Sequence, residues 1–224
     1  MEQQSGSPDN ALIGLNVKAN LKQGVQLYGQ LVLDEFLLKE IKARNGWWAN
    51  KQGLMAGFKS YNVFGIKNLH VQTEFSYVRP YTYEHREPLG NYGHYRQSLA
   101  HPMGANFWES VNFIYYKYKK LDVKARLSYA IIGYDYDSLN YGQNIYKSYE
   151  VNRPQEYGNS VGQGLKTSIT IPQLTVAYII NPAYNMKFFI DVMGRMAENR
   201  LGTQKTFSIQ AGICTNLFNR YYDY

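Results

Sequence analysis

Long stretches of strict alternation between apolar and polar residues constrain this chain more than any other feature. In the first stretch, Ile13, Leu15 and Val17 share one face, whereas Asn16 and Lys18 share the other. Alternation of this kind predicts a β-strand with one apolar and one polar face. No comparably long helical periodicity occurs, so we expect an all-β fold.

Nine strands are predicted from these patterns. The clearest alternation covers about residues 13–21, 25–34, 69–77, 123–131, 186–195 and 207–217. Weaker patterns predict strands at about 51–63, 105–119 and 166–180, and Pro172 indicates a sheet edge or a bulge in the last of them. Such segments exceed the roughly 5–6 residues of an average soluble strand and reach the about 9–11 residues that a tilted bilayer crossing needs.

The predicted connections alternate between short and long. Short turns are expected near residues 23–24, 65–68, 119–120 and 181–185, long loops near 35–50, 80–104 and 135–165, and an intermediate connection at about 196–203. Membrane barrels combine short periplasmic turns with longer outer loops, and they close because every backbone group in hydrocarbon needs a partner. We therefore predict an antiparallel up-and-down transmembrane β-barrel portion over residues 11–224, preceded by a disordered leader at residues 1–10.

An odd strand number has a further implication. Intact bacterial barrels normally have an even number of strands, which places both ends of the chain on one side of the membrane. We therefore expect the chain to be the C-terminal part of a larger barrel, without its N-terminal strands and signal peptide. The alternative is that residues 135–165 contain one or two further strands.

Composition excludes several classes of protein. The single cysteine, Cys214, excludes disulfides within the chain, and the 16% of aromatic residues argues against disorder. The net charge is +7, from 24 Lys and Arg against 17 Asp and Glu. These charges form no basic block and accompany no RNA-binding aromatic motif, so no nucleic-acid partner is expected. No apolar run reaches the roughly 18 residues of a membrane helix.

Several motifs resemble one family of proteins. They are LYGQ at 27–30, DEF at 34–36, EIKA at 40–43, NGWWANK at 45–51, VRPYTY at 78–83, NYGHY at 91–95, LAHPMGANF at 99–107 and NLFNRYYDY at 216–224. Together they resemble the C-terminal half of the RemB-like gliding-motility outer-membrane proteins of Bacteroidetes-type bacteria. Those proteins are similar in turn to the Wzi-like capsule-assembly barrels. The resemblance implies a large monomeric barrel of the bacterial outer membrane that holds surface polysaccharide, together with a role in surface motility.

The long loops contain the candidate ligand contacts. Aromatic rings stack on sugars, and arginine pairs bidentately with the carboxylate or phosphate groups of acidic glycans. The candidates are Trp47, Trp48, Arg79, Tyr81, Tyr83, Arg86, Tyr92, His94, Tyr95, Arg96, His101 and Trp108. The alternative is that these side chains pack the loops over the barrel mouth. The histidines match no zinc motif, and no metal site is assigned.

Two further features belong to the predicted barrel. Residues 34–45 are expected to form an amphipathic helix, capped by Asp34 and ended by Gly46, that seals a loop or acts as a lid. Charged residues line the predicted inner face: Lys18, Lys22, Asp34, Glu74, Asp122, Lys124, Arg126, Lys187, Asp191 and Arg195. They are expected either to pair across a filled barrel or to favour anionic solutes.

The predicted function is that of a non-enzymatic outer-membrane barrel of the capsule-assembly or gliding-motility type, at the surface of a Gram-negative cell. Its expected partners are the lipid bilayer, surface polysaccharide or lipopolysaccharide, and motility or secretion proteins. No catalytic residue and no cofactor is assigned. The main alternative is a channel for anionic solutes. An outer-membrane hydrolase, for which no nucleophile motif is present, and a soluble sugar-binding β-sandwich also remain open.

Overall fold

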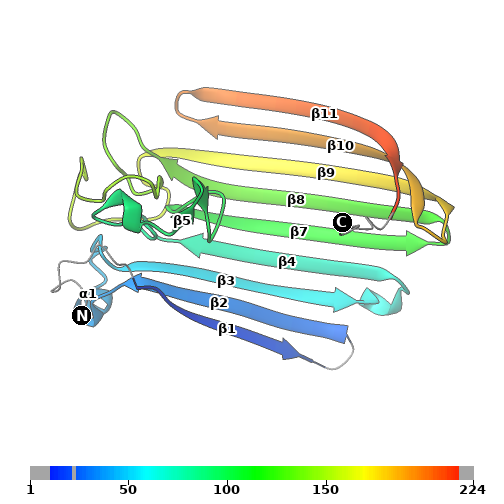
Figure 1. Cartoon of the computed structure of the whole chain (residues 1–224), viewed down its shortest axis with the longest axis horizontal. Coiled ribbons are helices and arrows are strands. Elements are labelled where there is room, and N and C mark those ends of the chain that lie inside the picture. Colours follow the sequence, from blue (N-terminus) through cyan, green and yellow to red (C-terminus); the bar gives the residue numbers. More distant parts are fainter. Residues whose placement is uncertain (1–10, 22–23, 217–224) are drawn as a thin grey trace, which may run out of the picture.

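The computed structural model describes residues 11–21 and 24–216. It is dominated by a nine-stranded antiparallel sheet whose strands follow one another in chain order (Figure 1). These strands are β1 (Ile13–Asn20), β2 (Val25–Glu35), β3 (Lys51–Tyr61), β4 (Leu69–Val78), β7 (Phe107–Tyr118), β8 (Leu121–Tyr134), β9 (Leu165–Asn181), β10 (Met186–Asn199) and β11 (Gly202–Cys214). The all-β prediction is confirmed. The sheet is not closed, because within the described residues β1 pairs only with β2 and β11 only with β10.

The register of the sheet keeps like residues on the same face. Leu31 of β2 lies opposite Leu15 of β1 and Leu54 of β3, whereas the adjacent Gln30 lies opposite Asn16. Because side chains alternate along every strand, a slip of one residue would exchange the two faces. The alternation in the sequence therefore appears in the fold as one apolar and one polar surface.

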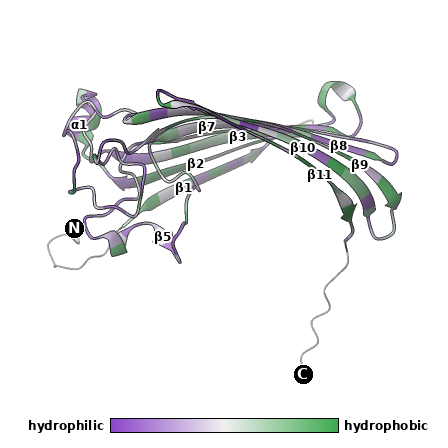
Figure 2. Cartoon of the chain, turned by 90° about the horizontal axis from the view of Figure 1, so that it is seen from above, coloured by the Kyte–Doolittle hydropathy of each residue, from purple (hydrophilic) through white to green (hydrophobic). Residues whose placement is uncertain are grey.

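The sheet curves, and the loop that carries β5 lies on its concave side (Figure 2). The polar face is the concave one, since Gln30 and Glu74 line a pocket there together with Tyr92 of a long loop. The opposite, convex face remains uncovered. Its large apolar side chains are exposed to between 36% and 67%, and they include Leu15, Val17, Leu31, Leu54, Phe75, Ile114, Leu127, Leu174, Val176, Phe188, Ile190, Phe207, Ile209 and Ile213.

The connections differ between the two ends of the sheet. At one end the strands are joined by residues 62–68, which include the 3-10 helix η3 (Val63–Gly65), by residues 119–120 and by residues 182–185. The other end has three long loops, 36–50, 79–106 and 135–164, as predicted. The same end also has a two-residue turn, Arg200-Leu201, between β10 and β11. The prediction of an intermediate connection there was wrong, because both strands extend further than their alternation indicated.

Two local expectations are not met, namely the alternative of further strands in residues 135–165 and the sheet edge or bulge at Pro172. The loop at 135–164 contains only the isolated bridge Tyr136–Leu139, so it adds no strand to the sheet. Pro172 lies inside β9, a central strand rather than an edge. The pairing of β9 with β10 is interrupted there without a change of register. Proline has no N–H to donate, and Gly194 lies opposite it, where a Cβ atom would be in ordinary contact with the proline ring at 3.5 Å.

The loops contain short elements of their own. The predicted helix at 34–45 is reduced to α1 (Leu38–Ala43). Asp34 does not cap it, because Asp34 belongs to β2 and its Oδ2 accepts a hydrogen bond from the Tyr83 N–H at 2.8 Å. Arg44, rather than Gly46, ends it in a left-handed conformation. The second loop contains the 3-10 helix η4 (Pro88–Gly90) and a small hairpin of β5 (Gly93–His94) and β6 (Gln97–Ser98), which the sequence patterns did not predict.

Within the described part of the chain, no helix combines the length and the apolar character required to cross a membrane. The predicted leader at residues 1–10 and the predicted inner-face residue Lys22 lie outside the described residues.

Candidate functional site

The three long loops pack against one another at one end of the sheet, and we call them together the cap. The cap consists of residues 36–50, 79–106 and 135–164. The Trp48 N–H donates to the Glu156 carbonyl at 3.0 Å, which joins the first loop to the third. The Tyr81 N–H donates to the Gly142 carbonyl at 2.9 Å, which joins the second loop to the third. The loops therefore form one folded unit.

Asn106 is the polar centre of this unit, and its side chain is fully buried. Its Nδ2 donates to the carbonyls of Gly133, Tyr141 and Gln163 at 2.7, 3.2 and 3.0 Å. Its Oδ1 accepts from the Gly162 N–H at 2.8 Å. One side chain thus holds the second loop, the end of β8 and the third loop in a single arrangement.

A buried cation, Lys51, joins β3 to the second and third loops of the cap. Lys51 is completely buried at the start of β3, and its Nζ lies 3.3 Å from Glu35 Oε2 and donates to the Glu84 carbonyl at 3.0 Å. The same Nζ lies 4.0 Å from the centre of the Tyr149 ring. A buried charge needs such partners, since removal from water is costly without them. We call Lys51, Glu35, Glu84 and Tyr149 the Lys51 cluster.

Trp48 is packed beside the Lys51 cluster. The Arg153 guanidinium lies 3.9 Å from the centre of its ring, and the Tyr149 ring centre lies at 4.7 Å. Arg153 also donates to the Tyr149 carbonyl and pairs with Glu156. A ring contacted in this way contributes to the packing of the cap.

Arg79 is a further cation of the cap and is partly buried. Its Nη2 donates to the Trp47 carbonyl at 3.2 Å, and burial lowers the pKa of its guanidinium.

The buried Glu84 carboxyl predicts a pH dependence of the cap. Burial raises its pKa from 4.5 to about 8, although a hydrogen bond from Asn140 and the charge of Lys51 oppose the shift. The folded cap therefore binds this proton more tightly than the unfolded chain. The stabilisation is fully present below pH 4.5 and is lost as the pH rises through 8. Hydrogen exchange of the loop amides at pH 5 and pH 9, corrected for intrinsic rates, is expected to show a less protected cap at the higher pH.

The matched variants for this prediction are Glu84→Gln and Glu87→Gln, the second at an exposed position of the same loop. Glu84→Gln is expected to flatten the pH dependence, and Glu87→Gln is expected to leave it unchanged. An unaltered pH dependence in Glu84→Gln would contradict the assignment.

A pocket of about 410 Å³ lies between the concave face of the sheet and the second loop. We call it the inner pocket. Tyr83 and Tyr92 stack with ring centres 5.7 Å apart on its loop side. Its sheet side includes Glu74 and Glu109, and His101 Nε2 lies 3.1 Å from Glu109 Oε2. Carboxylates, an imidazole and tyrosine rings in one cavity are suited to binding a polyhydroxylated ligand.

A second pocket of about 390 Å³ lies between the β5–β6 hairpin and the third loop. We call it the hairpin pocket. It is lined by Arg96, Gln97, Ser98, Pro102, Gly104, Gln143, Asn144, Ile145 and Tyr146. Unlike the inner pocket, it has no carboxylate among its described lining residues.

The predicted contact residues divide among these places. Tyr83, Tyr92 and His101 line the inner pocket, and Arg96 lines the hairpin pocket. Other candidates are exposed on the cap, namely Arg86, His94 and Tyr95. The packed candidates are Trp47, Trp48, Arg79 and Tyr81.

Two candidates are not placed to contact a ligand at the cap surface. Tyr81 is fully buried and its hydroxyl donates to the Asn140 carbonyl at 2.9 Å. Trp108 belongs to β7 rather than to a loop, and its ring lies beside Phe75 and Tyr129 on the convex face. The residue types were those of a contact surface, but the fold uses these two for packing.

Two residues of the site were missed. Glu109 is an inward residue of β7, opposite Ser76 of β4 and Ala130 of β8. The alternation of β7 would have placed it on the polar face. Lys51 ends the NGWWANK motif, but no pattern indicated that a lysine at a strand start is buried.

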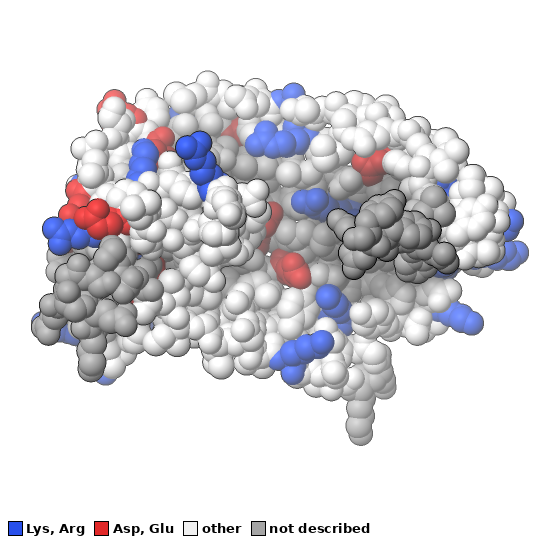
Figure 3. Space-filling model, viewed as in Figure 1, with Lys and Arg blue, Asp and Glu red and all other residues white. Residues whose placement is uncertain are grey.

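The inner-face charges follow the predicted polar face. Acidic and basic side chains lie together in the hollow of this face (Figure 3). Some have partners: Lys187 pairs with Asp122, Glu74 accepts from Tyr28 and Gln72, and Asp191 accepts from Gln173 and Thr175. Lys124 and Arg126 lie over the Phe113 ring, 5.4 and 6.0 Å from its centre. Lys18 and Arg195 occupy inward positions of β1 and β10 by register.

The loop histidines make separate contacts. His85 interacts with Glu87, His94 lies against Tyr95, and His101 approaches Glu109. Among the described residues, no group of three or more His, Cys, Asp or Glu side chains is arranged to hold a metal ion.

Comparisons with protein families, with curated proteins and with solved structures found no match for this chain.

Proposed function

We propose that the nine-stranded sheet is part of the wall of a bacterial outer-membrane β-barrel, and that its cap contacts surface polysaccharide without catalysing a reaction. The observation that carries the proposal is the uncovered apolar face. Soluble monomers rarely expose contiguous apolar patches of more than a few hundred Å². Here apolar side chains such as Leu15, Phe75, Leu127 and Ile209 extend across strands from β1 to β11. A lipid bilayer would remove this whole surface from water.

The direction of the strands supports a wall that continues beyond the described sheet. Nine antiparallel strands in chain order leave β1 and β11 running in the same direction. Their outer edges carry backbone groups that need partners in hydrocarbon. An odd number of additional strands between β11 and β1 would close an all-antiparallel barrel with an even total, as bacterial barrels have.

The cap supports the surface role. Long loops gather at one end of the sheet, as the outer loops of membrane barrels do. The two pockets of the cap and its exposed Arg86, His94 and Tyr95 offer aromatic and charged contacts to a glycan. The resemblance to RemB-like and Wzi-like proteins adds motility or secretion proteins as further partners.

Fractionation of the full-length protein tests the membrane assignment. We expect recovery in the outer-membrane fraction, extraction only with detergent, and faster gel migration of the unheated protein, as folded barrels give. Recovery in the soluble fraction without detergent would contradict the proposal. Deleting the gene is expected to reduce retained surface polysaccharide, and an unchanged amount would contradict the surface role.

A channel for anionic solutes is the second candidate. It is favoured by Lys124 and Arg126, which lie on the concave face against an aromatic ring rather than against a carboxylate. It is opposed by the cap, which packs over one end of that face. Planar-bilayer recording of the full-length protein distinguishes the channel from the polysaccharide-binding barrel. A steady anion-selective conductance indicates a channel, and the absence of conductance indicates a plugged barrel.

A further inference from the structure

The hairpin pocket is fixed on both sides by contacts between the second and third loops. The Ala105 N–H donates to the Gln143 carbonyl at 3.2 Å, and Gln143 Nε2 donates to the Met103 carbonyl at 2.7 Å. A Cβ atom on Gly104 would lie only 2.5 Å from the same Gln143 carbonyl. The two loops therefore approach as closely as glycine permits, and the pocket is part of the folded cap.

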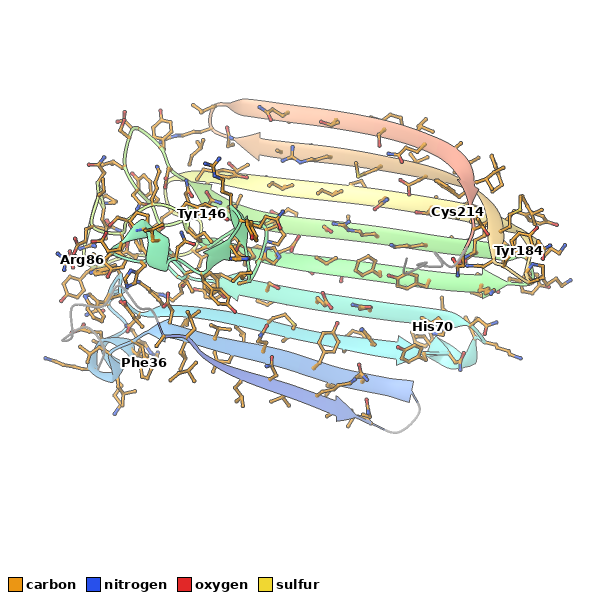
Figure 4. The ribbon with its side chains drawn as sticks, in the orientation of Figure 1. Phe36, His70, Arg86, Tyr146, Tyr184 and Cys214 are labelled. Carbon is orange, nitrogen blue, oxygen red and sulfur yellow. The ribbon has the colours of Figure 1, made fainter. Side chains whose placement is uncertain are left out.

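Tyr146 forms a wall of the pocket beside the hairpin (Figure 4). A Cβ atom on Gly93 would lie 3.0 Å from its ring, which places the ring directly against β5. The Tyr146 N–H is held by Asn144 Oδ1 at 3.1 Å. An aromatic ring in this position can pack against the face of a sugar ring.

The polar groups of the hairpin pocket include one cation and several neutral groups that can donate or accept hydrogen bonds. Gln97, Ser98 and Asn144 contribute amide and hydroxyl groups, and the buried Ser98 hydroxyl has no hydrogen-bond partner within the described residues. Arg96 supplies the positive charge. Among the described residues it takes part in no ion pair.

Arg96 lies in the turn of the hairpin, where its backbone has a conformation that is unfavourable for residues other than glycine and asparagine. Tyr95 and Arg96 both have positive φ, 47° and 59°, at the two central positions of the β5–β6 turn. Two-residue turns with positive φ at both positions favour Asn-Gly, because bulky side chains are strained there. Strained residues cluster at functional sites, and this turn places Arg96 in the lining of the pocket.

We propose that the hairpin pocket binds a carboxylate-bearing sugar residue, with Arg96 as the contact for its carboxylate. The inference rests on the proposed role of the cap in glycan contact and adds the class of sugar and its site. The guanidinium can donate two parallel hydrogen bonds to a carboxylate, while Gln97, Asn144 and Tyr146 face the rest of the ring. Glu74 and Glu109 make the inner pocket unsuitable for the same acid.

Binding of trigalacturonate and of neutral maltotriose to the full-length protein in detergent tests the inference by calorimetry. We expect trigalacturonate to bind at least tenfold more tightly. Arg96→Ala is expected to reduce its affinity about tenfold or more, and Arg96→Lys to recover only part of it, since lysine cannot make the bidentate contact. Maltotriose binding is expected to stay unchanged in both variants.

Arg44→Ala is the matched control. Arg44 lies in the first loop of the cap, is exposed and lines neither of the two pockets. It is expected to change trigalacturonate affinity less than twofold. Equal binding of the two trisaccharides, full affinity in Arg96→Ala, or an equal loss in Arg44→Ala would each overturn the hairpin site. None of these outcomes affects the membrane assignment, which is tested separately by fractionation of the full-length protein.

Discussion

Replacing Ile209 with arginine is expected to destabilise the folded protein in a bilayer by about 2–4 kcal/mol, the cost of a cation on the lipid face of a barrel near mid-membrane. Ile209 lies on the convex face of β11 between Phe207 and Ile213, and 64% of its side chain is exposed. In water such a position tolerates arginine at little cost. The destabilisation is therefore expected only if lipid covers this face.

The adjacent Gln210 provides the control, because it is exposed on the concave face of the same strand. Gln210→Arg is expected to change the free energy of unfolding by less than about 0.5 kcal/mol, as surface substitutions usually do. Denaturant titration of the full-length protein and both variants in phosphatidylcholine vesicles measures the difference. Equal stability of Ile209→Arg and Gln210→Arg would refute the assignment of the convex face to lipid.

Replacing Asn106 with alanine is expected to destabilise the cap by about 3 kcal/mol or more, because each buried polar group left without a partner costs about 1–3 kcal/mol. The change removes the donor shared by the Gly133, Tyr141 and Gln163 carbonyls and the acceptor for the Gly162 N–H. Amides of the second and third loops are expected to exchange about 100-fold faster, as that free energy implies.

Asn16→Ala, at an exposed position of β1, is the control and is expected to leave exchange in the loops unchanged. The strands themselves are expected to keep their protection in Asn106→Ala, since their hydrogen bonds do not depend on the cap. Unchanged exchange of the Gly162 amide in Asn106→Ala would show that the loops are held together by other contacts.

The strands could be predicted because they depend on a local rule. In a strand with one apolar and one polar face, the polarity of each residue indicates the face on which it lies. Segments such as 25–34 were therefore predicted within a residue or two of β2 (Val25–Glu35). The prediction failed where two chain segments interact. Pro172 indicates an edge by its own chemistry, but β9 pairs with β8 on one side and with β10 on the other, so Pro172 lies inside the sheet.

The cap was less predictable because its hydrogen bonds join distant parts of the chain. Asp34 is a residue type that often caps a helix. Here its carboxylate instead accepts a hydrogen bond from the Tyr83 N–H, 49 positions away. Asn106 carries no local signal of its role, since its partners lie 27 to 57 residues further along. The β5–β6 hairpin has two-residue strands and an unusual Tyr-Arg turn, so neither alternation nor turn composition indicated it.

The two-residue turn between β10 and β11 makes the outer rim of the proposed barrel uneven. Three of the connections at this end are long loops that form the cap. The fourth, Arg200-Leu201, directly follows the last residue pair of β10 and β11 and adds only two residues to the rim. If the cap holds a polysaccharide as proposed, the polymer would meet the least protein above β10 and β11. It would then extend away from the cap across these two strands.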